Sequence, residues 1–164
     1  MPLLNDTPAT ALNATLDFAF EMRVDFNDDR CIFGPLPGGG SQGYTPTSGG
    51  TIYGPRLQGR IVPYSGADFA TVRGDGVIEI NSHYLLEVDD GTNIYIRNQG
   101  YLVPAKKGEG LLVDGVPQPA YFRFSPTFRV PAGPHDWIAR TMFVGAGERH
   151  ADPDFSLFRY YAVG

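Results

Sequence analysis

Apolar and polar residues alternate with a period of two along most of the chain. The clearest run is Leu16-Asp17-Phe18-Ala19-Phe20-Glu21-Met22-Arg23-Val24-Asp25-Phe26, in which every second side chain is a large apolar one. This period gives an extended strand one apolar face and one polar face. Comparable strands are predicted over residues 51–53, 57–62, 69–73, 77–88, 93–102, 121–130, 137–144 and 156–163.

Turn sequences separate these strands. Asp75-Gly76 and Asp89-Asp90-Gly91 are typical of tight turns, because glycine adopts positive φ and aspartate bonds to nearby backbone. Residues 34–50 are so rich in Gly, Pro, Ser and Thr that a long loop is predicted there. No helix longer than a turn or two is predicted, although residues 134–137 can be helical. About nine short strands favour an all-β barrel or a sandwich.

Length and charge narrow this picture. A chain of 164 residues fits one domain. We expect residues 1–14 to form a flexible N-terminal arm and residues 15–164 to form the β domain. The formal net charge of -5 and the absence of a Lys/Arg cluster argue against a nucleic-acid partner. No apolar stretch is long enough for a membrane span.

The expected location is cytoplasmic and the expected chemistry needs no cofactor. The chain has one cysteine, Cys31, and its first residues lack the basic start and apolar run of a signal peptide. Neither a P-loop nor a dinucleotide fingerprint is present. His83, His135 and His150 do not have metal-ligand spacing, so no metal is expected.

Two motifs carry a family resemblance. Gly54-Pro55-Arg56-Leu57-Gln58-Gly59, followed by Pro63-Tyr64-Ser65-Gly66-Ala67-Asp68-Phe69, resembles the Gly-Pro-x-Leu-x-Gly … Pro-Gly-Gly-Ala-Asp-Trp signature of domain of unknown function 3237, also called uncharacterised protein family 0311. Further matches follow in order at Tyr84, at Asp89-Asp90-Gly91, at Ile94-Tyr95, at Gly100 and over residues 121–128, 137–140 and 143–149. The resemblance implies a single antiparallel β-barrel, similar to allene-oxide-cyclase and lipocalin-like architectures, with very little helix. It also implies a homodimer, and it implies no established reaction.

Three residues are candidates for catalysis. Asp68 follows a Gly-containing turn at the lip of a strand, and Asp90 has a comparable place. One interpretation is that each is a turn residue whose carboxylate accepts hydrogen bonds from backbone N–H groups. The other is that each carboxylate lies at a desolvated mouth of the barrel, where a raised pKa would suit it to act as a general acid or base. His83 shares a strand face with Glu79 and Glu87. If that face lines a cavity, His83 is a base near neutral pH, and otherwise the face is solvated.

Arginine and aromatic residues are candidates for binding. Arg123 and Arg140 have aromatic and aliphatic neighbours, which predicts either buried ion pairs or binding of a carboxylate, phenolate or enolate. Tyrosines can bond to a ligand but are also ordinary strand residues. Trp137 is expected in the core or in a dimer interface rather than as a stacking platform. The candidate substrate-binding residues are Tyr53, Arg56, Tyr84, Tyr95, Arg123, Trp137 and Arg140.

The expected function is binding of a small apolar, aromatic or polyketide-like molecule inside a barrel. One interpretation is a cofactor-free isomerase, cyclase or lyase, in which an aspartate or histidine moves a proton while arginine and tyrosine steady an oxyanion. A second is a non-catalytic carrier or sensor, and a third is a structural dimer with a filled barrel. A cavity that contains Asp68 or His83 and an arginine favours a ligand site.

Overall fold

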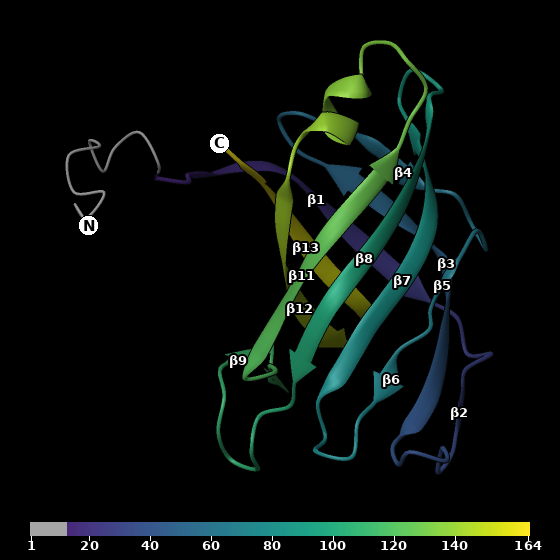
Figure 1. Cartoon of the computed structure of the whole chain (residues 1–164), viewed down its shortest axis with the longest axis vertical. Coiled ribbons are helices and arrows are strands. Elements are labelled where there is room, and N and C mark those ends of the chain that lie inside the picture. The colour runs from purple at the N-terminus through teal and green to yellow at the C-terminus, as the bar shows by residue number, and fades with distance from the viewer. Residues whose placement is uncertain (1–12) are drawn as a thin grey trace, which may run out of the picture.

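The chain forms a closed antiparallel barrel, and the computed structural model describes residues 13–164 of it (Figure 1). Residues 1–12, most of the predicted N-terminal arm, lie outside the described residues. The barrel has eight strand positions, and the predicted single antiparallel β-barrel is confirmed. Six long strands neighbour one another in the order β1 (Leu16–Phe26), β13 (Asp154–Val163), β12 (Phe143–Ala151), β11 (Tyr121–Arg129), β8 (Asn93–Val103) and β7 (Ile78–Val88).

The remaining positions close the ring. Three short strands, β4 (Gly59–Ile61), β5 (Ala67–Asp68) and β6 (Thr71–Val72), pair with β7 on one side and with β3 (Ser41–Tyr53) on the other. β3 then pairs with β1, so the sheet has no free edge along this path. A short strand, β2 (Cys31–Phe33), pairs with the start of β3. β9 (Leu112–Val113) and β10 (Val116–Pro117) form a separate hairpin in the β8–β11 connection.

One end of the barrel is closed by aromatic packing and a helical turn, η2 (Asp136–Arg140), at the top of Figure 1. Ile138 of η2 is buried, and Trp137 packs against Phe143 with ring centres 5.9 Å apart. Phe20 in turn packs near Phe143, with ring centres 6.5 Å apart, and stacks on Tyr160 at 4.6 Å. This half of the interior is therefore a packed core.

The structure corrects one predicted loop and two predicted strands. Residues 41–50, predicted as part of a loop, belong to β3. A bulge opposite Asp25 and Phe26 accommodates its glycines, and Gly50 is required because a Cβ there would lie 1.9 Å from the carbonyl oxygen of Arg23. The predicted strand over 137–144 is wrong for its first part, where η2 lies, and β12 continues instead to Ala151.

The predicted strand over 69–73 is shorter in the structure, where only Thr71 and Val72 of that range pair as β6. Among residues 13–164, no helical segment has the length and apolarity needed to traverse a bilayer.

Candidate functional site

The other half of the barrel interior contains a cavity of about 430 Å³. β2 and β6, at the bottom of Figure 1, contribute Cys31, Ile32 and Val72 to its lining, so the cavity lies at this end of the barrel. One wall consists of β7 side chains. Because side chains alternate between the two faces of a strand, Ile78, Ile80, Ser82 and Tyr84 all point inward. The lining is mostly apolar and includes Phe26, Ile32, Tyr44, Val72, Leu102, Phe122 and Phe158; its polar members include Arg30, Thr45, Asp68, Arg149 and Ser156.

A close approach between two strands brings Asp68 into this cavity. In β5, Asp68 pairs with Ser82 of β7 and with Thr45 of β3, which gives it the inward orientation of Ser82. Gly66, just before β5, passes so close to β7 that a Cβ there would lie 1.7 Å from the carbonyl oxygen of His83. A glycine at this position therefore lets β5 enter the barrel wall.

The carboxyl group of Asp68 has a strongly shifted pKa. Burial raises the pKa from 3.8 to about 6, against a lowering effect from the backbone N–H of Asn81, which donates to Oδ1 at 3.1 Å. A carboxyl group with a pKa near 6 exchanges its proton readily at physiological pH. This is the property of a general acid or base.

Tyr84 is the next inward residue of β7 after Ser82, deeper in the barrel than Asp68, and it is fully buried. Burial, and secondarily the charge of Asp68, raises the pKa of the Tyr84 phenol well above its ordinary value, so the phenol stays protonated. A line of polar groups continues from Ser82 into the core: Asn98 donates to the Ser82 hydroxyl at 3.3 Å, and the Tyr160 hydroxyl donates to Asn98 at 3.3 Å. These bonds satisfy the polar groups that the core buries.

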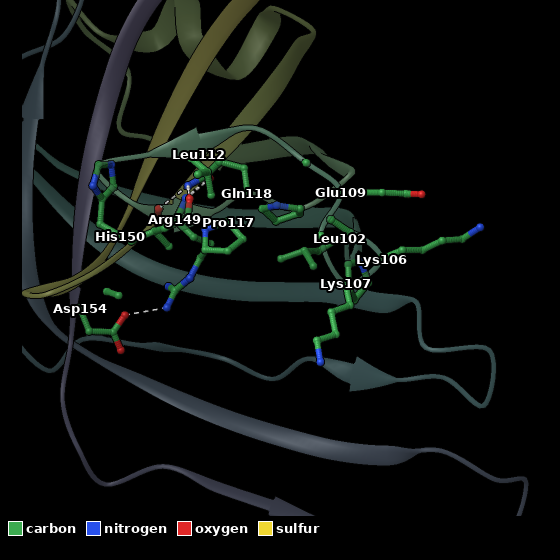
Figure 2. Close-up of a pocket in the computed structure, with 17 residues that line it drawn as sticks. Leu102, Lys106, Lys107, Glu109, Leu112, Pro117, Gln118, Arg149, His150 and Asp154 are labelled. Carbon is green, nitrogen blue, oxygen red and sulfur yellow. Dashed lines mark hydrogen bonds and ion pairs between the residues drawn. The ribbon is translucent and has the colours of Figure 1, made fainter.

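Arg149 stands across the cavity from Asp68, and the guanidinium group of Arg30 reaches the same carboxylate, Asp154, as Arg149 does. β12 is four positions from β5 around the ring, which places Arg149 on the opposite wall. One guanidinium nitrogen of Arg149 donates to Asp154 at 2.6 Å (Figure 2), and another donates to the Ser156 hydroxyl at 2.8 Å. Arg30 forms a 2.6 Å ion pair with the other carboxylate oxygen of Asp154. The site thus combines the titratable carboxyl group of Asp68, a mostly apolar lining and the two guanidinium groups of Arg30 and Arg149.

A second hollow of about 840 Å³ lies between the β8–β11 connection and β12 (Figure 2). It shares Leu102 and Arg149 with the cavity. Gln118 fixes the connection to β12, since its side chain accepts from the backbone N–H of Arg149 at 2.8 Å and donates to the Arg149 carbonyl at 2.7 Å. The interior cavity, unlike this hollow, is lined by the largely buried carboxyl group of Asp68, so we take the barrel interior as the candidate site.

Two of the predicted site residues, Asp68 and Tyr84, line the cavity. His83 and Tyr95 lie on the outer face of the barrel, where the His83 Nδ1 and the Tyr95 hydroxyl are hydrogen-bonded at 2.5 Å. Burial, and secondarily the positive charge of Arg97, lowers the pKa of His83. Arg123 is also on the outer face, where it donates to the carbonyl of Phe122 at 2.9 Å.

The other predicted residues lie at the closed end. Asp90 contacts His135 at 2.8 Å, and backbone and side-chain hydrogen bonds from Thr92, followed by that from His135, lower the pKa of Asp90 to about 2. Arg56 lies 3.8 Å above the ring of Trp137.

Two exposed residues complete the set. Arg140 pairs with Asp136 at 2.7 Å in η2. Tyr53, at the end of β3, is 71% exposed. The structure therefore separates the ten predicted residues into the cavity, the outer face and the closed end.

Arg149, Arg30, Ser82 and Asp154 were not among the predicted site residues. The signal for Arg149 was present: Phe143, Gly145, Gly147 and Arg149 are two residues apart, so an inward Phe143 implies an inward Arg149. Because this strand was predicted to end at residue 144, the shared face of Phe143 and Arg149 was not recognised. Within residues 13–164, no group of three His, Cys, Asp or Glu side chains is arranged to hold a metal ion.

The family model for the protein of unknown function DUF3237 matches residues 14–163. The chain belongs to this family. A UPF0311 protein of Rhodopseudomonas palustris is 35% identical over 122 residues, which cover 70% of this chain and 76% of that protein. Another UPF0311 protein, from Bradyrhizobium diazoefficiens, is 30% identical over 148 residues, 86% of this chain and 93% of that one. These findings confirm the resemblance read from the motifs.

Solved structures show the same barrel. A β-barrel like protein from Acinetobacter baumannii aligns with a TM-score of 0.81 and 28% identity, over 99% of this chain and 100% of that chain. An enzyme from Penicillium herquei aligns with a TM-score of 0.72 and 18% identity, over 98% of this chain and 100% of that chain. The second likeness concerns the fold alone.

Proposed function

We propose that the barrel interior binds a small, partly apolar molecule and that Asp68 transfers a proton to or from it. The observation that carries this proposal is the Asp68 carboxyl group, which projects into an apolar cavity and has its pKa raised by burial to about 6. A volume of about 430 Å³ is within the range of small-molecule sites. Enclosure by apolar side chains strengthens every polar contact a ligand makes there.

The reaction class that fits is a cofactor-free isomerisation, cyclisation or elimination. In each, one base accepts a proton from the substrate and the same group returns it at another atom or to a leaving group, so atoms and electrons balance without a redox partner. The neutral Tyr84 phenol and the Arg149 guanidinium are suited to stabilise the negative charge that develops on a substrate oxygen. The occurrence of this fold in a Penicillium herquei enzyme is consistent with catalysis.

The test begins with the ligand itself. Freshly purified protein, incubated with a metabolite extract and freed of excess by gel filtration, is examined by native mass spectrometry for a retained small molecule. That molecule is then incubated in D₂O with the wild-type protein and with Asp68→Asn. We expect the wild-type protein to convert it or exchange its protons, and we expect Asp68→Asn to bind it without conversion.

Two outcomes contradict the proposal in different ways. If the wild-type protein returns the molecule unchanged and without deuterium, the barrel is a carrier or sensor. If Asp68→Asn converts it as fast as the wild type, Asp68 is not the proton-transfer group. Asp90→Asn is a matched control, because it removes a carboxylate from the closed end of the barrel, outside the cavity.

A further inference from the structure

The wall of the cavity opposite Asp68 carries more positive than negative charge in a protein that is acidic overall. Arg30 and Arg149 both face Asp154, at 2.6 Å each, so two guanidinium groups share one carboxylate. Their guanidinium carbons also lie over the same ring, that of Phe26, at 5.5 Å and 5.2 Å from its centre. Because arginine keeps its charge at every physiological pH, this arrangement leaves one positive charge uncompensated.

The two guanidinium groups keep N–H donors free for a ligand. Arg149 uses one donor on Asp154 and one on Ser156, and Arg30 uses one on Asp154 and one on the carbonyl of Asn27. A guanidinium group has more N–H donors than these contacts use. The side chains of Arg30 and Arg149 are 35% and 31% exposed, so the free donors are accessible from the mouth.

We infer that the ligand of this cavity is an organic anion with an apolar body, whose carboxylate or other ionised oxygen binds Arg149 and Arg30. The inference rests on the proposed binding function and names its substrate class. Arginine binds planar carboxylates with paired N–H bonds, which fixes their orientation. Since Asp68 is on the opposite wall, an anion held at Arg149 directs its apolar body across the cavity toward the proton-transfer group.

The test compares two fluorescent probes with the same aromatic body. 1-Anilinonaphthalene-8-sulfonate carries a sulfonate in the place of a carboxylate, and N-phenyl-1-naphthylamine lacks it. We expect the wild-type protein to bind the anionic probe at least about tenfold more tightly, a difference of roughly 1.4 kcal/mol. Arg149→Met should remove this preference and leave the affinity for the neutral probe within about twofold. Arg140→Met, which deletes an arginine at the closed end, should leave both affinities unchanged.

Further measurements keep the test decisive. If Arg149→Met does not fold, the salt dependence of the wild-type protein replaces it: raising the salt concentration about tenfold should weaken the anionic probe alone. Val72→Trp narrows the cavity and should weaken the binding of both probes, which locates them inside the barrel.

Equal affinity of the wild-type protein for the two probes overturns the anion inference while leaving the binding function intact. Failure of both probes to bind contradicts the binding function and the inference together.

Discussion

The backbone N–H of Asn81 donates a 3.1 Å hydrogen bond to Oδ1 of Asp68 across the pairing of β5 with β7. This bond holds the carboxyl group against the barrel wall and favours its ionised form. Burial in the apolar cavity has the opposite effect on the pKa and is the larger of the two. Asp68 is therefore fixed in position and still able to take up a proton near neutral pH.

Asp68→Asn should change the pH dependence of folding stability. The pKa of about 6 in the folded protein is above the ordinary 3.8, so the folded state binds the proton more tightly and the stabilisation falls as pH rises through this window. Wild-type protein should lose on the order of 2–3 kcal/mol of unfolding free energy from this group between pH 4 and pH 8. Urea unfolding should show Asp68→Asn equal to wild type at pH 4 and more stable at pH 8. Parallel pH profiles for the two proteins would contradict the shift.

Gln118→Ala should loosen the segment between β8 and β11. The Gln118 side chain forms both hydrogen bonds that join this segment to the backbone of Arg149, and its removal leaves two backbone groups without these partners. We expect faster amide hydrogen exchange over residues 104–119 and at Arg149, with a loss of about 1–3 kcal/mol in stability. Unchanged exchange in Gln118→Ala would show that the contact does not hold the segment.

Gly145→Ala should destabilise the barrel. A Cβ at this position would lie 2.0 Å from the Phe124 ring, which occupies the space that the glycine leaves. Overpacking of this kind costs about 1–3 kcal/mol. Gly74→Ala is the matched control, because a Cβ there meets nothing within 4 Å. Thermal unfolding of both variants gives the comparison, and equal melting temperatures would be inconsistent with this packing.

Asp90→Asn should leave ligand binding unchanged. Asp90 and His135 form their 2.8 Å contact at the closed end, outside the interior cavity. The affinity for the anionic probe, measured by fluorescence titration, should stay within about twofold of wild type. A larger loss would mean that the closed end takes part in binding.

The sequence predicted the strands whose two faces differ clearly. β1, β7 and β8 match their predicted ranges to within a residue, since their period-two patterns reflect one face in the core and one outside. The alternation on β7 also predicted Ser82 and Tyr84 on a shared face, opposite that of His83. Which face lines the interior became clear only with the closed barrel, because both faces of this strand carry polar groups.

The same pattern failed where glycine replaces the apolar residue. In β12 the inward positions Gly145 and Gly147 hold no side chain, because the rings of Phe124 and Phe122 from β11 fill their space. The apolar side chains that pack at these positions therefore belong to β11, and β12 itself lacks the expected alternation. For this reason the strand was predicted to end before Arg149. Composition likewise concealed β3, whose Gly and Thr residues support a bulge within a strand.

The titration of the Asp68 carboxyl group tests the central claim most directly. In protein labelled with ¹³C at aspartate, the side-chain carboxyl signal of Asp68, assigned by its absence in Asp68→Asn, can be followed by NMR between pH 3 and pH 9. We predict a midpoint at about 6, and a shift of that midpoint when the anionic probe occupies the cavity. A midpoint near 3.8 that does not respond to the probe would show a solvated carboxylate and contradict the site proposed here.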